Sequence, residues 1–387
     1  MCGIVGFAHG NKPADLDALV AMLSVIRHRG PDQFGAYLDG AAALGSARLS
    51  INDLEGGLQP AVSEDHRVGI VFNGEIFNYL DLRADLERRG VRFQTRSEVE
   101  TLLWLYRTEG EAMFARINGQ FAIAIWDGRS QRLLLARDRF GIRPLFWSQD
   151  GDEVRFGSEI KALAATRPGL ALDRLALLQT LRFWTVAGER TAFAGIRQVP
   201  PASFVEATPD GIRVRRYWEW PVVPSPDPIE LPSDADYAEM FRDELDRSVR
   251  RQKMADVTVG SYLSGGIDSS AIAALLERQD QGHLKTYSIA FKDPEYDESE
   301  AQRVMAEAFG FDHTTVTVDK ADIADVFPQV VWHAEAALFR SAPAPLFLLA
   351  RAVHADSLKV VMTGEGSDEV LLGYDLFREI AIRGFWA

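Results

Sequence analysis

The chain has 387 residues, of which 47% are hydrophobic and 25% are charged, as is typical of a globular protein. At about 150 residues per domain, this length predicts two or three domains. The net charge of −14 disfavours nucleic acid and anionic membranes as partners. No apolar run reaches the ~20 residues that span a bilayer, and the N-terminus lacks a signal-peptide pattern. We therefore expect a cytoplasmic protein without nucleic-acid or membrane partners.

The first part of the chain mixes short apolar runs with amphipathic segments. Four runs predict β-strands, at residues 3–8, 68–72, 121–126 and 132–136. Leucines at helical spacing predict helices around residues 16–26 and 82–86. This mixture favours an α+β layered domain, a β-sheet sandwich flanked by helices, over residues 1–205.

A proline-rich stretch then separates two kinds of pattern. Five prolines stand at positions 221, 224, 226, 228 and 232, a density that excludes a helix or a central strand. We therefore predict an interdomain linker over residues 206–235.

Strands and helices alternate after this stretch. Strands are predicted at residues 257–263, 286–291 and 359–363, and helices at 237–250, from 269, from 298 and at 374–386. This order predicts an α/β doubly wound parallel sheet over residues 236–387. Because the last helical pattern stops at Ala387 without a cap, we expect this domain to be incomplete at its C-terminus.

The single cysteine, Cys2, follows the initiator methionine and excludes an internal disulfide. Removal of Met1 would leave a thiol and a free α-amine on one residue. With an ordinary pKa near 8, such an amine is partly neutral at pH 7 and can serve as the general base for the thiol. For Cys2 taken alone, an incidental cysteine is the alternative interpretation.

Two polar segments could assist such a nucleophile. Asn73-Gly74-Glu75 follows an apolar strand, where a side-chain amide and a glycine N–H could face a developing oxyanion; the alternative is a β-turn. Arg48 lies on a strand-like segment and is either a solvated edge residue or a clamp for a carboxylate.

Four motifs together resemble class II glutamine amidotransferase domains; they occupy residues 1–6, 27–32, 72–79 and 137–141. In that family an N-terminal cysteine attacks the glutamine carboxamide, and water hydrolyses the thioester to glutamate while ammonia is released. The resemblance implies that Cys2 is nucleophile and base, that Asn73 and Gly74 form the oxyanion hole, and that Arg48 binds the glutamine α-carboxylate.

The resemblance also implies the remaining glutamine-binding residues, Glu75 and Glu98. The family usually has an aspartate that holds the substrate α-ammonium where this chain has Glu98, which keeps the charge and moves it by one methylene. The loop over the glutamine site would be ordered by Arg27, His28, Arg29 and Asp32, and Lys161 is expected to be structural.

A glycine- and serine-rich loop follows the strand predicted at residues 257–263. It supplies two glycines, three hydroxyls and a helix N-terminus, which together predict a phosphate cradle over residues 264–270; a capped helix start is the alternative. The loop lacks a P-loop lysine, so we do not expect γ-phosphoryl transfer. Asp268 beside phosphate indicates Mg²⁺.

A second acidic turn follows the strand at residues 359–363. Glu365, Asp368 and Glu369 would repel each other without a cation, and in a doubly wound sheet such a turn meets the phosphate loop in one crevice. The two loops resemble the ATP-pyrophosphatase domain of asparagine synthetases.

That resemblance implies a role for each loop residue. Mg²⁺ would be held by Asp268 and Asp368, and Glu365 would lie beside the activated carboxyl group. The ATP-binding set would be Leu263, Ser264, Gly265, Gly266, Asp268, Ser269, Ser270, Ile289, Thr363 and Gly364.

The whole chain thus resembles the glutamine-hydrolysing asparagine synthetase family. The implied reaction adenylates aspartate with MgATP, releases pyrophosphate and lets internally carried ammonia displace AMP to give asparagine. The implied partners are glutamine, aspartate and ATP, and the resemblance is compatible with a homodimer. Two alternatives stay open: amidation of another carboxylate in secondary metabolism, or a truncated glutaminase or non-catalytic regulator.

The acceptor pocket has the weakest sequence signal. Glu335 and Arg340 are candidates for it, and a surface salt link explains them equally well. Family members continue past the second acidic turn and supply a lysine near the ATP phosphates, whereas no lysine follows Lys359 here. We therefore expect this polypeptide, as it stands, to hydrolyse glutamine but to make little or no asparagine.

Overall fold

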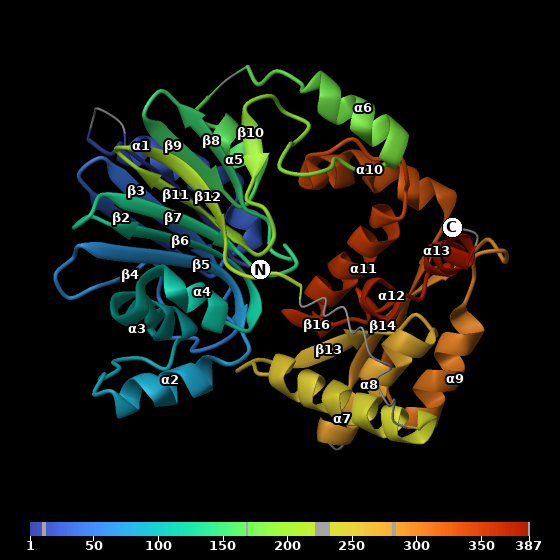
Figure 1. Ribbon diagram of the computed structural model, residues 1–387. Helices are drawn as coiled ribbons and strands as arrows, with labels where there is room; N and C mark the ends of the chain where they lie inside the picture. Colours follow the sequence, from blue (N-terminus) through green and yellow to red (C-terminus); the bar gives the residue numbers. More distant parts are fainter. Residues whose placement is uncertain (10–12, 168, 221–232, 281–283, 386–387) are drawn as a thin grey trace. The chain divides into compact units, whose positions relative to one another are not determined.

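The computed structural model describes residues 1–9, 13–167, 169–220, 233–280 and 284–385, which form two compact units (Figure 1). Unit 1 contains Met1–Ile229 together with the short segment His333–Phe339. Unit 2 contains Glu230–Trp332 and Arg340–Ala387. The prolines on which the linker prediction depends fall within 221–232, outside the described residues.

Unit 1 is built on two antiparallel six-stranded sheets. The first has the order β10 (Ile196–Gln198), β8 (Phe146–Asp150), β9 (Glu153–Gly157), β1 (Gly3–Ala8), β3 (Ala42–Arg48) and β2 (Gln33–Asp39). The second has the order β12 (Gly211–Arg216), β11 (Ser203–Thr208), β7 (Arg132–Arg137), β6 (Gly119–Asp127), β5 (Val68–Ile76) and β4 (Ala61–Val62).

Helices accompany these sheets in unit 1. They are α1 (Leu16–Val25), α2 (Tyr79–Arg88), α3 (Glu98–Glu109), α4 (Met113–Arg116), α5 (Ile160–Ala164) and α6 (Arg174–Phe183), with 3₁₀ turns at Arg27–Arg29 and Gly110–Ala112. Side chains cap three of the starts: Asp15 accepts the first free N–H groups of α1, Ser97 accepts the Glu100 N–H of α3, and Asp173 accepts the Leu175 and Ala176 N–H groups of α6.

The period of β6 explains why unit 1 is layered. Alternate residues Phe121, Ile123 and Ile125 pack in a core with α2 and α3, whereas Ala122, Ala124 and Trp126 pack in a second core shared with the other sheet. Both faces of the strand are therefore buried, and its sequence is continuously apolar. A third core joins α1 to the outer face of β1 and β3. The predicted sandwich flanked by helices is confirmed.

Unit 2 is a four-stranded parallel sheet in the order β15 (Asp312–Val318), β14 (Lys285–Phe291), β13 (Val259–Tyr262) and β16 (Val360–Met362). Its helices are α7 (Asp234–Gln252), α8 (Ile267–Asp280), α9 (Ser299–Phe309), α10 (Lys320–Ala334), α11 (Pro343–Ala355), α12 (Ser367–Leu371) and α13 (Asp375–Phe385). The last residues of α10 belong to unit 1.

Two apolar clusters cover this sheet. Residues of α7, α8 and α9 form one cluster through Val249, Leu276 and Ala306, and α11 forms the other by packing Leu349 and Val353 with Tyr287 of β14. Helices on both faces of a parallel sheet define the doubly wound class, which confirms the second part of the fold prediction.

The structure differs from the sequence prediction at the domain boundary. Strands β11 and β12 belong to the second sheet of unit 1, so regular structure continues past residue 205, where the predicted domain ends. Residues 203–207 are buried and pair with β7, which explains why they belong to the sheet and not to a linker. Helix α7 likewise begins at Asp234, inside the range predicted as linker.

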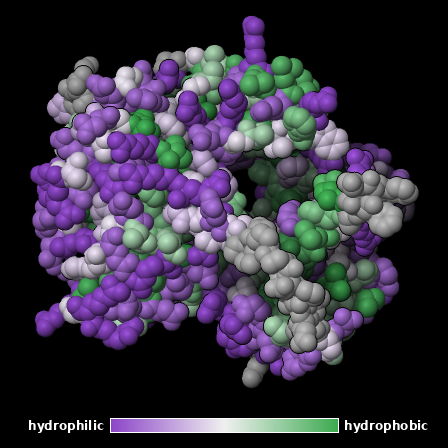
Figure 2. Space-filling view, in the orientation of Figure 1, coloured by the Kyte–Doolittle hydropathy of each residue, from purple (hydrophilic) through white to green (hydrophobic). Residues whose placement is uncertain are grey.

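Exposed apolar side chains gather over α6 in unit 1. Figure 2 shows hydrophobic side chains gathered over α6, where Leu178, Leu181 and Phe183 are exposed. None of the helices in the described ranges combines the length and apolar character that crossing a bilayer requires.

The layered core of unit 1 predicts a contrast between two leucines. Leu102 of α3 is completely buried, whereas Leu80 of α2 is 52% exposed. We expect Leu102→Ala to lower the free energy of unfolding by about 2–5 kcal/mol and Leu80→Ala to change it by about 0.5 kcal/mol or less. Urea unfolding followed by circular dichroism measures both; equal losses in the two variants would contradict the assigned packing.

Candidate active site

A small pocket lies at the start of β1 in unit 1. Its lining contains five of the residues implied by the amidotransferase resemblance, Cys2, Arg48, Gly74, Glu75 and Glu98, together with Leu49, Ile51, Asn52, Gly57, Gln59, Phe72, Ser97 and Val99. The ladder pair Gly3–Ala47 between β1 and β3 brings Cys2 beside the end of β3, where Arg48 stands. The fold thus gathers residues that are up to 96 positions apart in the sequence.

The Cys2 thiol is half-buried and donates to the Leu49 carbonyl at 3.6 Å. Burial raises the pKa of this thiol, so it needs a base to become a nucleophile. Burial also lowers the pKa of the chain's terminal amine, which belongs to Met1 here, to about 5. An amine in this environment is therefore neutral at pH 7 and able to accept a proton.

Asn73 and Gly74 lie on β5, paired with Ala122 and Phe121 of β6. The Asn73 side chain is completely buried, and among the residues that the structure describes neither its amide nitrogen nor its amide oxygen has a hydrogen-bond partner. Asn73 is not among the residues that line the pocket, although its neighbours Phe72 and Gly74 are. Leaving a buried amide unpaired costs about 1–3 kcal/mol, so the Asn73 side chain has unused hydrogen-bonding capacity next to the lining strand.

Gly74 cannot be replaced without a backbone shift. Its φ is +153°, and a Cβ at this position would lie 2.0 Å from the Gln120 carbonyl oxygen. The close approach of β6 therefore requires glycine, and it leaves the Gly74 backbone open to the pocket. The β-turn considered as the alternative for Asn73-Gly74 is not formed, because both residues lie within the strand.

Arg48 is buried and firmly held at the end of β3. Its guanidinium donates to the Gln33 side chain at 2.7 Å and to the carbonyl oxygens of Asn52 and Asp53 at 2.8 Å each. The solvated edge position considered from the sequence is wrong. These bonds to neutral groups orient the guanidinium, and its positive charge can attract an anion in the pocket that Arg48 lines.

Glu75 and Glu98 bring two carboxyl groups to the same pocket. Asn52 donates to Glu75 at 2.7 Å, and the Ile76 N–H donates to Glu98 at 2.8 Å. Burial raises the pKa of Glu75 to about 7, and burial together with the neighbouring Glu75 charge raises the pKa of Glu98. Two buried carboxyl groups in one pocket favour a cationic ligand group, which would lower both pKa values.

The second candidate site lies at the carboxyl ends of β13 and β16, which pair in parallel. In the phosphate loop, Gly265 has a φ of +84°, and the Ser264 and Ser269 hydroxyls are 2.8 Å apart. Ser270 is buried, and its hydroxyl has no hydrogen-bond partner within the part of the chain that the structure describes. The cradle therefore retains a free buried hydroxyl for a ligand oxygen.

The two acidic loops approach each other at Gly364. A Cβ on Gly364 would lie 3.0 Å from the Asp268 Cβ and from the Ser269 backbone nitrogen, so a side chain there would crowd the phosphate loop. The turn that carries Glu365 and Asp368 thus adjoins the loop that carries Asp268. Carboxylates in this position fit a hard cation such as Mg²⁺.

The remaining nucleotide-site candidates surround these loops. Leu263 is buried and donates its N–H to the Tyr287 carbonyl of β14, Ile289 lies further along β14, and the Thr363 hydroxyl accepts the Glu365 N–H at 3.4 Å. Glu335, a sequence candidate for the acceptor pocket of the second domain, instead belongs to unit 1.

Three site residues have no counterpart in the sequence prediction. The Leu49 carbonyl contacts the thiol, and Asn52 holds Glu75. Gln302 of α9 is buried, donates to the Ile289 carbonyl at 3.0 Å and lies beside Gly265, and its oxygen is unpaired within the described ranges. A backbone carbonyl and two isolated amides form no motif, so spacing alone could not single them out.

Comparisons with known proteins identify the two domains in which these sites lie. The family model described as glutamine amidotransferase domain matches residues 1–218, and the model described as asparagine synthase matches residues 240–387. The glutamine-hydrolyzing asparagine synthetase 1 of Bacillus subtilis is 35% identical over 384 residues, which cover 98% of this chain and 60% of that protein.

Two further relatives with similar coverage carry different names, one an asparagine synthetase and one an amidase. The glutamine-hydrolyzing asparagine synthetase 3 of Bacillus subtilis is 31% identical, with 97% of this chain and 64% of that protein covered. The amidase chyE of Penicillium rubens is 33% identical, with 98% and 60% covered. The chain spans between 60% and 64% of the length of these relatives. The chain belongs to the glutamine amidotransferase family, with an asparagine synthase domain after the amidotransferase domain.

Proposed function

We propose that unit 1 hydrolyses glutamine at Cys2 and that unit 2 adenylates a carboxylate, aspartate being the expected acceptor, so that ammonia can convert it to an amide. The observation that carries the first half is the pocket that brings Cys2 together with Arg48, Gly74, Glu75 and Glu98. The buried Asn73 amide, unpaired within the described residues, precedes Gly74 on β5 and adds support. The relatives named as glutamine-hydrolyzing asparagine synthetases support aspartate as the acceptor.

The glutaminase step uses groups already gathered in the pocket. A neutral α-amine on Cys2 takes the thiol proton, and the thiolate attacks the glutamine carboxamide carbon. The Asn73 amide and the Gly74 N–H would stabilise the oxyanion, ammonia leaves after protonation by the same amine, and water then hydrolyses the thioester to glutamate. Arg48 and the Glu75–Glu98 pair would bind the two charged ends of the substrate.

The synthetase step would use the two loops of unit 2. Ser264, Ser269 and Ser270 would hold the phosphates of ATP, and Glu365 would lie beside the acceptor carboxyl group. Asp268 and Asp368 would hold Mg²⁺, which when bound neutralises phosphate charge. The free Ser270 hydroxyl and the proximity of Gly364 to Asp268 support this assignment.

The acceptor is the least constrained part of the proposal, because a relative with the same coverage is named an amidase. A screen of carboxylic acids for ATP-dependent pyrophosphate release decides among acceptors, and aspartate is expected to give the fastest release. The expected Mg²⁺ requirement, the homodimer and the cytoplasmic location remain predictions.

Replacement of the nucleophile tests the first half. Cys2→Ala should lower glutamine hydrolysis by about 10³-fold or more, because no other thiol is present, while leaving whatever ammonia-dependent synthesis the chain performs unchanged. Glutamate formation measures the first activity. Hydrolysis at the wild-type rate would refute the assignment. Mass spectrometry should also find Met1 removed, since the base must be the Cys2 amine.

The Glu75–Glu98 pair predicts a pH dependence of glutamine binding. Burial raises the pKa of Glu75 to about 7 and also raises that of Glu98, so Glu75 loses its proton as pH rises through about 7 and then carries a charge that attracts an α-ammonium. The glutamine KM should therefore fall as pH rises through this range. Glu98→Gln, which can still accept the Ile76 N–H, should raise KM by about 10-fold or more and weaken this dependence.

A substrate without the α-amine provides the control for this effect. Glutaramic acid lacks the ammonium group, so its KM should not fall over the same pH range. A fall of equal size for both substrates would show that the carboxyl pair does not recognise the ammonium.

The phosphate loop is tested separately. Asp268→Asn should slow pyrophosphate release by on the order of 10²-fold, because an amide is a poor ligand for a divalent cation, and should leave glutamine hydrolysis unchanged. Asp312→Asn, an exposed position on β15, is the matched control. Equal losses of both activities in the Asp268 variant would indicate a folding defect and count against the assigned site.

A further inference from the structure

A second group of buried charges lies behind the nucleophile in unit 1. The Arg29 Nε donates to the Cys2 carbonyl at 3.0 Å, and its Nη1 donates to Glu159 at 3.0 Å. Glu159, which precedes α5, is only 7% exposed at its side chain. The residue before it, Ser158, exchanges hydrogen bonds with Ile4 in both directions. Glu159 is therefore linked to Cys2 through Arg29 and to Ile4 through the neighbouring residue Ser158.

Lys161 extends this group away from the pocket. Its ammonium donates to Glu159 Oε2 at 2.6 Å and lies 3.1 Å from Glu335 Oε1. Glu335 also accepts the backbone N–H groups of Ile160 and Lys161, at 2.5 and 2.6 Å. The Glu335 side chain is only 9% exposed, so these bonds hold the segment His333–Phe339 against the start of α5.

The charges in this group balance. Arg29 and Lys161 are positive, Glu159 and Glu335 are negative, and all four side chains are at most 9% exposed. Removing one member of such a set leaves a buried charge uncompensated, which is strongly unfavourable. The hydrogen bonds from His28 and Lys161 outweigh burial and lower the pKa of Glu159 to about 2, so its charge persists at neutral pH.

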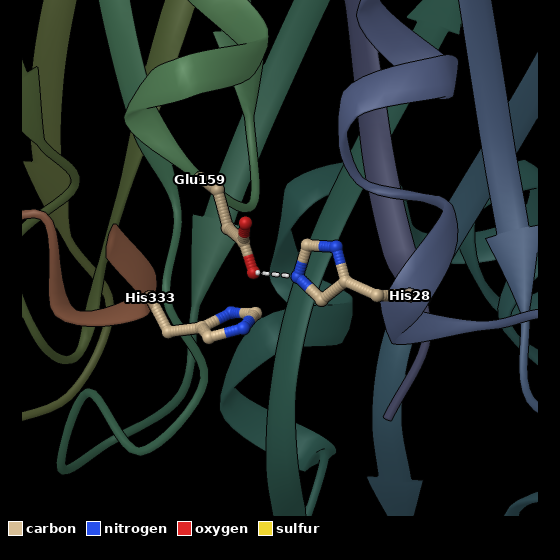
Figure 3. A group of neighbouring side chains, drawn as sticks. All are labelled: His28, Glu159 and His333. Carbon is tan, nitrogen blue, oxygen red and sulfur yellow. Dashed lines mark hydrogen bonds and ion pairs between the residues drawn. The ribbon is translucent and has the colours of Figure 1, made fainter. Parts of the chain in front are cut away.

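Two histidines adjoin the group. Figure 3 shows His28 bonded to Glu159, at 2.9 Å, with His333 beside both, and the two imidazole rings meet edge to face at 4.8 Å. The three residues offer ligand atoms within 4.8 Å of one another. A divalent cation there would face Arg29 and Lys161, which already bond to both Glu159 oxygens, so this arrangement favours a protein network over a metal site.

We propose that Glu159 is a positioning residue for the glutaminase reaction and that Glu335 makes this positioning depend on the docked segment His333–Phe339. The inference rests on the proposed glutaminase function. Glu159 holds Arg29 against the Cys2 carbonyl, and Glu335 fixes Lys161 and the backbone on the other side of Glu159. Along the chain, this segment lies between the body of α10 and the start of α11.

Neither carboxylate lines the glutamine pocket, so the proposal predicts effects on kcat without effects on KM. Glu159→Gln should lower kcat for glutamine hydrolysis by about 10-fold or more, and Glu335→Gln by about 3-fold, with KM changed less than 2-fold. Glu87→Gln, whose partner Arg83 lies at 3.0 Å on the exposed face of α2, is the matched control and should match wild type.

Hydrogen exchange provides the readout for docking. The Ile160 and Lys161 N–H groups bond to different oxygens of Glu335, and glutamine keeps only one acceptor oxygen. Exchange of at least one of these amides should therefore accelerate in Glu335→Gln, and both should stay at the wild-type rate in Glu87→Gln. Faster exchange at these amides together with lower kcat supports the proposal. Faster exchange with wild-type kcat would overturn the role of the segment, and so would unchanged exchange.

Glu159→Gln decides the positioning role. A folded variant, with the wild-type urea midpoint and wild-type kcat, would overturn it; if that variant does not fold, the kcat of Glu335→Gln decides instead. A wild-type chain that does not hydrolyse glutamine would refute the proposed function itself, an outcome distinct from a difference among active variants.

Discussion

The burial of strand β1 between β3 and β9 is the constraint on which the candidate glutaminase site depends. Ile4 and Val5 are completely buried, and the strand is hydrogen-bonded on both edges. The backbone position of Cys2, which precedes the strand, is therefore closely constrained. Cys2 stands one residue before the first ladder pair. The same ladder positions the end of β3. The contact between the thiol and the Leu49 carbonyl therefore follows from backbone pairing.

Two groups of buried charges flank this strand end, and they differ in whether the charges are balanced. Glu75 and Glu98 share the pocket; burial raises the pKa of both, and the Glu75 charge raises that of Glu98 further, a state that a bound ammonium group would relieve. Arg29, Glu159, Lys161 and Glu335 instead satisfy one another. The unbalanced pair is suited to recognising a charged substrate, and the balanced set is suited to holding backbone in place, because the cost of burying charge is already offset there.

Local patterns predicted much of the fold. Continuous apolar runs marked β1, β5, β6 and β7, and the glycine- and serine-rich loop marked the start of α8. Edge strand β15 was missed because its residues Asp312–Val318 are mostly polar, and α10 contains Pro328, which interrupts the helical pattern. The sequence alone leaves Glu335 as a candidate for the acceptor site. Only the tertiary structure shows that its carboxylate accepts the backbone N–H groups of Ile160 and Lys161 in α5.

The most direct test of the central claim is to trap the glutamine site covalently. A glutamine analogue that carries a diazoketone in place of the carboxamide is incubated with the chain, and peptide mass spectrometry locates the label. The account predicts one label per chain, on Cys2, with glutamine protecting against it and Glu98→Gln slowing it. Labelling at another residue, or labelling of Cys2 that glutamine does not slow, would contradict the assignment of this pocket.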